Sequence, residues 1–238
     1  MPTRARILID RRDTHRLIPT KYAPSVLENL GLRPEVAHNL SEIDALTNQR
    51  IIAERGGDTG INPYELIFGV REAKIIYAAF SHRSDYGGRF NGSQRGAWYA
   101  GFTLETSAHE VAYQKARFLR NLRAEEPQRF DYQDFETDFR GEFDALTEEE
   151  RRSCLQPEPI PQCYTPSQAL ASILLEQGSL GLLYPSTRDP ENGMCLVCFR
   201  PALVASTRRT LAYRMTIDPG HRFDPARDME QLPANKSH

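Results

Sequence analysis

Residues 97–119 have the sequence AWYAGFTLETSAHEVAYQKARFL, and their hydrophobic period changes near residue 103. The first six residues are aromatic or small, which favours a short strand. Thr103 or Thr106 supplies a helix N-cap, and the apolar residues beyond it recur at helical spacing. A strand that passes directly into an amphipathic helix indicates an α+β or a mixed α/β protein.

The surrounding sequence predicts several more strands and one more helix. Strands are expected at residues 64–70, 73–80, 180–183, 194–199, 201–206 and 210–217. Thr165-Pro-Ser-Gln168 combines a capping box with proline at the first helical position, and it predicts a helix that ends at Gly178. Residues 124–150 alternate aromatic and charged side chains, which predicts edge strands with a solvated acidic face. We expect an α+β fold in which helices flank a mixed β-sheet.

The chain divides into three parts by composition. Residues 1–62 form an expected N-terminal helical extension, with helices in 23–56 after a basic segment that is a tail or a short first strand. Residues 63–218 hold the predicted strands and form the main domain. Residues 219–238 are polar and are expected to form a loose C-terminal tail.

Composition excludes several functional classes. The 238 residues carry 30 Lys and Arg against 32 Asp and Glu, so no strong field favours nucleic acid or an anionic membrane. No apolar run approaches the roughly 20 residues of a membrane span, and the first residues lack a signal-peptide apolar region. We expect a cytoplasmic protein that binds neither nucleic acid nor membrane.

Common motifs for phosphate, dinucleotide, zinc and serine-hydrolase sites are absent. Cys195-Leu-Val-Cys198 has the C-x-x-C spacing of metal and redox sites but lies in a predicted strand, where side chains three apart point to opposite faces. We expect two buried thiols there, and no metal.

Three stretches remain, and together they carry a resemblance. They are Gly87-Gly-Arg-Phe-Asn91, then Ala97-Trp-Tyr-Ala100 with Thr106-Ser-Ala-His-Glu-Val111, then Gly181-Leu-Leu-Tyr-Pro-Ser-Thr-Arg188. In this order they resemble the RES-domain family, whose members are toxins of bacterial toxin–antitoxin pairs. The resemblance spans about residues 64–215. It implies an ADP-ribosyltransferase-like fold and destruction of NAD at the nicotinamide–ribose bond, by phosphorolysis or hydrolysis.

The resemblance implies catalytic roles for four residues. Arg89 would bind the pyrophosphate, because a guanidinium matches phosphate oxygens. Glu110 would stabilise the oxocarbenium-like ribose that forms as nicotinamide leaves. Tyr99 would stack on nicotinamide or bind a ribose hydroxyl, and Ser186 would bind the carboxamide or the ribose.

Further NAD contacts are implied for Gly88, Asn91, Arg71 and Arg95. Many members of the family have another arginine in the first strand, near the position that Gly69 holds here. Arg71 is close to that position but not aligned with it. NAD is the substrate, phosphate is an optional co-substrate, and no resident cofactor is required.

Alternatives remain open at this point. The acceptor is phosphate, water or a protein side chain, and the last would make the chain a protein ADP-ribosyltransferase. A catalytically silent binding protein of the same fold is a further alternative. The resemblance implies an Xre-type antitoxin that covers the active site, and homodimerisation is left open.

Overall fold

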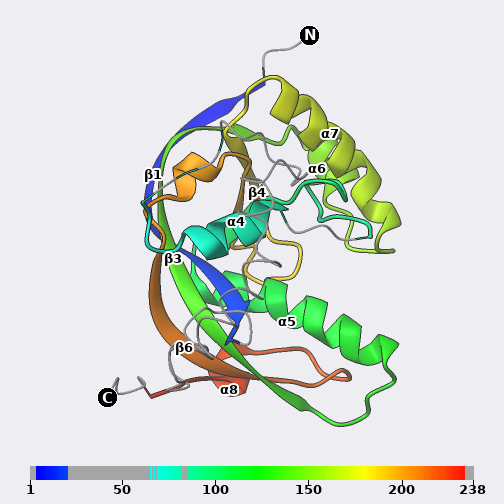
Figure 1. The fold of residues 1–238 in the computed structure, drawn as a ribbon. Coiled ribbons are helices and arrows are strands. Elements are labelled where there is room, and N and C mark those ends of the chain that lie inside the picture. The colour runs from blue at the N-terminus through cyan, green and yellow to red at the C-terminus, as the bar shows by residue number, and fades with distance from the viewer. Residues whose placement is uncertain (1–3, 21–64, 66, 68, 82–84, 234–238) are drawn as a thin grey trace.

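A computed structural model describes residues 4–20, 65, 67, 69–81 and 85–233, which form a mixed sheet with flanking helices (Figure 1). The strands are β1 (Arg6–Pro19), β2 (Trp98–Gly101), β3 (Gln128–Ala145), β4 (Gly181–Pro185), β5 (Met194–Cys198), β6 (Arg208–Ile217) and β7 (Met229–Gln231). The helices are α4 (Ala73–Ser81), α5 (Leu104–Asn121), α6 (Glu148–Cys154), α7 (Thr165–Glu176) and α8 (Pro225–Asp228), with 3₁₀ turns η3 (Gln162–Tyr164) and η4 (Pro201–Val204). The expected α+β class is confirmed.

The sheet curls back on itself. Its strand order is β1-β2-β5-β4-β3-β6-β7, and β1 also pairs with β3 (Figure 1). The β1–β3 pairing is antiparallel and runs along most of β1, with a bulge between Arg11 and Thr14. A bulge increases local twist and bending, which favours such a curl. The parallel pair is β3 with β4, and the other pairs are antiparallel.

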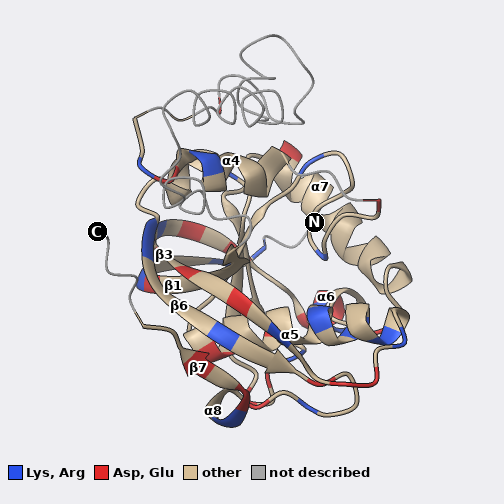
Figure 2. Cartoon of the chain, turned by 60° about the horizontal axis from the view of Figure 1, so that its bottom comes forward, with Lys and Arg blue, Asp and Glu red and all other residues tan. Residues whose placement is uncertain are grey.

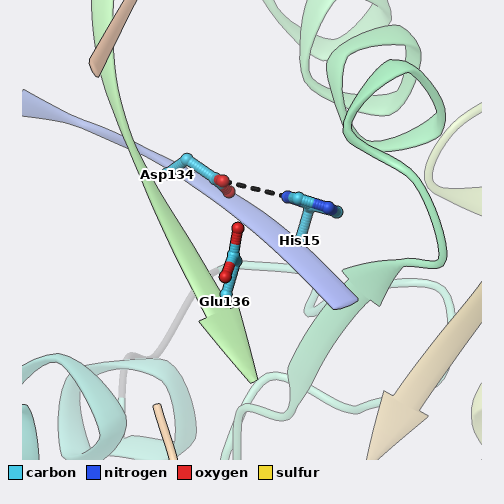
Figure 3. Close-up of side chains that lie close together, drawn as sticks. All are labelled: His15, Asp134 and Glu136. Carbon is cyan, nitrogen blue, oxygen red and sulfur yellow. Dashed lines mark hydrogen bonds and ion pairs between the residues drawn. The ribbon is translucent and has the colours of Figure 1, made fainter. Parts of the chain in front are cut away.

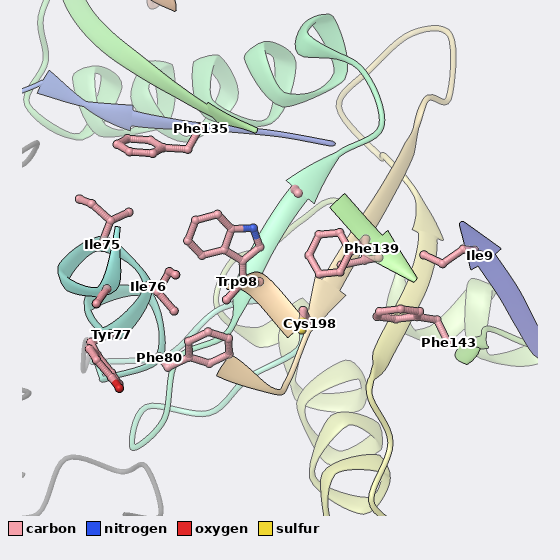
Figure 4. Close-up of a cluster of buried hydrophobic side chains, with 14 of the residues drawn as sticks. Ile9, Ile75, Ile76, Tyr77, Phe80, Trp98, Phe135, Phe139, Phe143 and Cys198 are labelled. Carbon is pink, nitrogen blue, oxygen red and sulfur yellow. The ribbon is translucent and has the colours of Figure 1, made fainter. Parts of the chain in front are cut away.

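One face of the sheet packs against α4 in the largest hydrophobic cluster (Figure 4). Trp98, Phe80, Phe139 and Phe143 in this cluster are at most 1% exposed. Complete burial of such a side chain contributes about 1.5–3 kcal/mol. The cluster joins residues of β1, β2, β3 and β5, so it stabilises the curled sheet as a unit.

Helix α5 packs against residues of β1, β3 and β6. Ala108, Ala112 and Ala116 are buried on α5, and their cluster includes Leu17 and Met215. Because these alanines are small, the helix lies close to the strands. Among the residues described, no helix combines the length and the apolar character needed to cross a membrane.

Several local predictions are confirmed. The strand expected at 97–102 is β2, and the helix after it is α5, with Thr103 as its N-cap. The Thr103 side chain accepts a hydrogen bond from the Thr106 backbone N–H at 3.2 Å. The helix expected after Thr165 is α7, although its N-cap is Tyr164 and no side chain caps it.

Two predicted strands are helical instead. Residues 73–80 lie in α4, because Ile76, Tyr77 and Phe80 are buried on one side of a helix while Lys74 is exposed. Their β-branched and aromatic content suggested a strand, but a short apolar run fits a buried helix as well as a buried strand. The strand expected at 201–206 is η4, which begins at Pro201. At 64–70, the described residues form no strand, and Gly69 has a φ of +73°.

Residues 124–150 do not form edge strands. Residues 128–145 form β3, which pairs with β1, β4 and β6 and is therefore central. Arginines of the neighbouring β6 meet its acidic side chains, so basic and acidic residues interleave on this surface (Figure 2). Arg214 bonds Asp131 at 2.7 Å, for example. The acidic excess of this segment is thus partly neutralised within the sheet.

The two ends of the chain also differ from the expectation. Arg6–Pro19 is a strand of 14 residues, so the interpretation of this segment as a first strand is confirmed, although the strand is long; it is neither a tail nor part of a helical extension. The helices expected at 23–56 lie outside the described residues. At the C-terminal end, the expected loose tail contains α8 and β7, and β7 pairs with β6.

Truncation of the main core should destabilise the fold. Phe139→Ala is expected to lower the free energy of unfolding by about 3–5 kcal/mol, because Phe139 is 1% exposed and a cavity would remain. Urea denaturation followed by circular dichroism measures this loss. Leu8→Ala is the control, since Leu8 is 73% exposed, and an equal loss in both variants would contradict the assignment of the core.

Candidate active site

The N-terminal part of α5 is fastened to two neighbouring segments. The Ser107 hydroxyl donates to the His15 carbonyl on β1 at 2.6 Å and accepts from the Gly101 N–H at 3.0 Å. The Thr106 hydroxyl donates to Asp189 Oδ2 at 2.8 Å, in the loop between β4 and β5. These bonds fix the position of Glu110, one turn further along the helix.

Glu110 and Ser186 are brought together from positions 76 residues apart. The Ser186 hydroxyl donates to Glu110 Oε1 at 2.6 Å and accepts from the backbone N–H groups of Arg188 and Asp189. Ser186 is 2% exposed. Its hydroxyl is thus committed to Glu110 and to its own turn, which makes it a positioning residue.

A cavity of about 520 Å³ lies beside this pair, between α5, β1, β2 and the loop at 87–89. Its lining includes Gly88, Arg89, Tyr99 and Glu110 from the expected set. The volume suits a small-molecule ligand, since such pockets measure about 300–1,000 Å³. Ser186 is not among the lining residues, consistent with its place behind Glu110.

The charged side chains of the cavity are mainly cationic. Arg16, Arg89, Lys115 and Arg188 line it, and Glu110 is the only carboxylate among the described lining residues. Such a surface favours an anionic ligand, and Glu110 adds one negative charge to the cationic lining. It is therefore suited to a phosphate-bearing molecule with a cationic part.

Arg89 is held by backbone carbonyls and by an aromatic ring. Its Nη1 donates to the carbonyls of Cys154 and Gln156 at 2.7 and 2.9 Å, and its guanidinium lies 5.0 Å from the Tyr164 ring centroid. Arg188 is held in a similar way, with Nη2 donating to the Pro157 carbonyl at 2.8 Å. None of these partners carries a charge that cancels the guanidinium.

Arg16 is a cavity residue that sequence reasoning missed. It lies on β1, where its Nη1 donates to the Tyr99 carbonyl at 3.1 Å and its guanidinium lies 4.7 Å from the Trp98 ring centroid. Among the described residues, its Nε is one of the buried polar atoms without a hydrogen-bond partner. Burial lowers the pKa of Arg16 to about 10. No sequence motif links Arg16 to the other site residues, because it reaches the cavity only through the pairing of β1 with β2 and β3.

Asn91 and Tyr99 stabilise the glycine loop. The Tyr99 hydroxyl donates to Asn91 Oδ1 at 2.7 Å and accepts from the Phe90 N–H at 2.9 Å. Asn91 Nδ2 donates to the Gly92 and Arg95 carbonyls, and Asn91 does not line the cavity. A Cβ at Gly88 would lie 2.8 Å from the Tyr99 hydroxyl, so this close approach requires glycine. Tyr99 and Gly88 face the cavity, whereas Asn91 supports the loop from behind.

Arg95 and Arg71 lie outside the cavity lining. Arg95 binds Glu65 through two hydrogen bonds of 2.7 and 3.0 Å, and it also donates to the Phe199 carbonyl. Arg71 is exposed beside the first turn of α4. The structure therefore does not bring these two arginines to the other candidate site residues.

The C-x-x-C cysteines lie on opposite faces of β5, as the sequence predicts. Cys198 belongs to the cluster that includes Trp98, whereas Cys195 belongs to a second cluster and lines the cavity. Both thiols are buried and neither forms a disulfide. Burial raises the pKa of Cys198 to about 12, so the thiol stays protonated at neutral pH.

One comparison with known proteins identifies the family of the chain. The family model of the RES domain matches residues 63–218. The chain belongs to the RES-domain family. The match includes Arg89, Tyr99, Glu110 and Ser186 but begins after β1, which contributes Arg16 to the same cavity.

Two other comparisons were with curated proteins and with solved structures. No curated protein matches the chain. Among solved structures, the crystal structure of the M. tuberculosis MbcT–MbcA toxin–antitoxin complex is similar at 14% identity, over 59% of this chain and 81% of that one, with a TM-score of 0.36.

The environment of Glu110 predicts a pH-dependent stability. Burial raises the pKa of Glu110 above its ordinary value of 4.5, although Ser186, Arg188 and Arg89 act against this rise. The folded state therefore holds the proton more tightly than the unfolded state, and the free energy of unfolding falls as the pH rises above 4.5 through the raised pKa.

Glu110→Gln should remove this effect. The free energy of unfolding of the variant minus that of the wild type should therefore increase as the pH rises from about 4 to 7. Urea denaturation at several pH values measures the difference. Glu149→Gln, at an exposed position of α6, controls for loss of a charge. A difference for Glu110→Gln that does not change with pH would contradict the raised pKa.

Proposed function

We propose that the chain cleaves the nicotinamide–ribose bond of NAD, with phosphate or water as the acceptor, as the toxin of a toxin–antitoxin pair. Membership of the RES-domain family supports this reading. The observation that carries it is a single carboxylate, Glu110, held by Ser186 at the edge of a cationic cavity.

The charges of the cavity match the charges of NAD. The pyrophosphate is anionic and requires cationic donors, which Arg16, Arg89 and Arg188 supply. The nicotinamide ring and its ribose carry positive charge before and during cleavage. Glu110 supplies the matching negative charge on the lining.

The proposed reaction requires little acid catalysis. The bond between ribose C1′ and the nicotinamide nitrogen breaks, and its electron pair returns to the ring, so nicotinamide leaves as a neutral molecule. The ionised Glu110 carboxylate stabilises the oxocarbenium-like ribose. An oxygen of the phosphate dianion then bonds to C1′, or a water oxygen does so and loses a proton to solvent. Ser186 keeps Glu110 in place and favours its charged form by donating a hydrogen bond.

NAD is a substrate in this proposal, and no resident cofactor takes part. An antitoxin that covers the cavity is the proposed protein partner. Tyr86 and Phe118 are exposed aromatic residues of the cavity lining. An aromatic rim of this kind suits burial under a partner protein.

Purified protein incubated with NAD, with and without phosphate, tests the proposal. Loss of NAD that requires phosphate and gives a phosphorylated ADP-ribose establishes a phosphorylase, and loss without phosphate that gives ADP-ribose establishes a glycohydrolase. Glu110→Gln should lower turnover by about 10²–10⁴ while the circular dichroism spectrum is unchanged. Wild-type turnover in that folded variant would overturn the role of Glu110. Absence of NAD loss in the wild type would favour a protein acceptor or a silent binding protein.

The arginine assignment has its own test. Arg16→Gln should weaken NAD binding by at least about tenfold, because a buried guanidinium that faces a phosphate contributes on the order of 1.5–3 kcal/mol. Arg71→Gln is the matched control and should bind NAD as the wild type does, since Arg71 lies outside the cavity lining. Calorimetric titration with a non-cleavable NAD analogue measures both affinities. Equal losses would show a long-range charge effect and not a contact.

A further inference from the structure

Three potential metal ligands meet on β1 and β3. His15, Asp134 and Glu136 each offer a ligand atom, and these atoms lie within 4.8 Å of one another (Figure 3). The strand register produces this arrangement: His15 lies opposite Glu136, and Asp134 is two residues from Glu136 on the same face of β3. They are the only such group among the residues that the structure describes.

Asp134 gives an independent reason to expect a cation. It is 1% exposed, and its Oδ2 accepts hydrogen bonds from His15 Nδ1 and Thr210 Oγ1, both at 2.9 Å. Its other oxygen, Oδ1, is buried and has no hydrogen-bond partner. An unsatisfied buried carboxylate oxygen is costly and rare in folded proteins. Figure 3 shows the carboxylate directed toward His15 and Glu136.

We propose that His15, Asp134 and Glu136 bind one Zn²⁺ ion. One imidazole and two carboxylates are a donor set that zinc accepts, with water completing a tetrahedron. Mg²⁺ and Ca²⁺ prefer oxygen ligands throughout, so the imidazole disfavours them. The ion would bond Asp134 Oδ1 and neutralise two neighbouring carboxylates.

Zinc binding would change the contacts within the cluster. Ligand atoms about 2.0–2.2 Å from zinc lie roughly 3.4 Å apart in a tetrahedron, and the ligand atoms of the cluster lie within 4.8 Å of one another. His15 Nδ1 now contacts Asp134 Oδ2 at 2.9 Å, so the imidazole would exchange this hydrogen bond for a bond to the ion. Arg208 Nη2 lies 3.0 Å from Glu136 Oε2 and holds that oxygen, so Oε1 is the proposed ligand atom. Contacts of this kind orient ligating carboxylates in metal sites.

Zinc at this position would join β1 to β3 directly beside Arg16. It would act on the stability of the sheet, and its binding is measurable without NAD. His15 also lines the cavity, but zinc binding is measured without NAD, so failure of this proposal is distinguishable from failure of the function proposed above.

Isothermal titration of the EDTA-treated full chain with zinc chloride, in a buffer without phosphate, tests the site. We expect one zinc per chain and a higher melting temperature with zinc than with EDTA. Mg²⁺ should produce neither effect. Asp134→Asn and Glu136→Gln should each weaken zinc binding by at least about 10- to 100-fold, the loss that follows removal of even an outer contact to a ligand. Their folding is checked by circular dichroism, and Glu136→Gln decides the result if Asp134→Asn does not fold.

The chain offers a matched control. His221 Nδ1 lies 2.7 Å from Asp218 Oδ2 in an exposed pair that is not part of the three-ligand cluster. His221→Gln should leave zinc binding unchanged, since a single histidine–carboxylate pair is a weak site. Three results would overturn the proposal: no zinc binding by the wild type, wild-type affinity in folded Glu136→Gln, or loss of binding in His221→Gln. Any of them would leave the cluster as a His15–Asp134 ion pair.

Discussion

The pairing of β1 with β3 joins the edge strand of a curled sheet to its fifth strand and carries the N-terminal segment to the site. The contacts of α5 depend on it, because Ser107 donates to the carbonyl of His15 on β1. The position of Arg16, the residue after His15, at the cavity also depends on this pairing. Closing so long a loop costs chain entropy, which the continuous ladder of backbone hydrogen bonds offsets together with the buried aromatic core. Residues 6–19 are thus part of the working domain, although the family match begins at residue 63.

Among the residues that the structure describes, several arginines differ in the charge of their partners. Arg95, Arg200 and Arg214 pair with carboxylates, and those pairs are nearly neutral toward the surroundings. Arg89 and Arg188 are held by backbone carbonyls and aromatic rings. Neutral partners fix a guanidinium in place without cancelling its charge. The cavity therefore keeps a positive potential, and the residues at 154–164 that hold both arginines act as part of the site.

Local signals in the sequence predicted local features well. The cap at Thr103, the helix after Thr165 and the split of Cys195 and Cys198 between two faces each depend on a few neighbouring residues. The prediction made from a short apolar run was wrong at residues 73–80, because the side chains of α4 suit either a strand or a helix.

The site was predictable only in part, because its contacts join distant segments. Glu110 and Ser186 entered the prediction through a family resemblance and not through any pattern that links them. Arg16 was missed because its strand finds its partner more than a hundred residues later. Asn91 was included as the last residue of the Gly87–Asn91 motif and Arg95 as its neighbour, but the structure commits their polar groups to the loop and to Glu65.

The position of Glu110 carries a cost that explains the buried serine. Burial disfavours the charged carboxylate, yet the reaction proposed for this site requires that charge to stabilise a cationic transition state. A donor that contacts the carboxylate lowers its pKa and fixes its orientation without adding a positive charge that would compete with the substrate. Ser186 meets both conditions, because its hydroxyl accepts from two backbone N–H groups while it donates to Glu110. A lysine or arginine there would hold the carboxylate more strongly but would cancel the negative charge that the proposed reaction needs beside a cationic ribose. A neutral hydroxyl therefore suits this position better than a salt bridge.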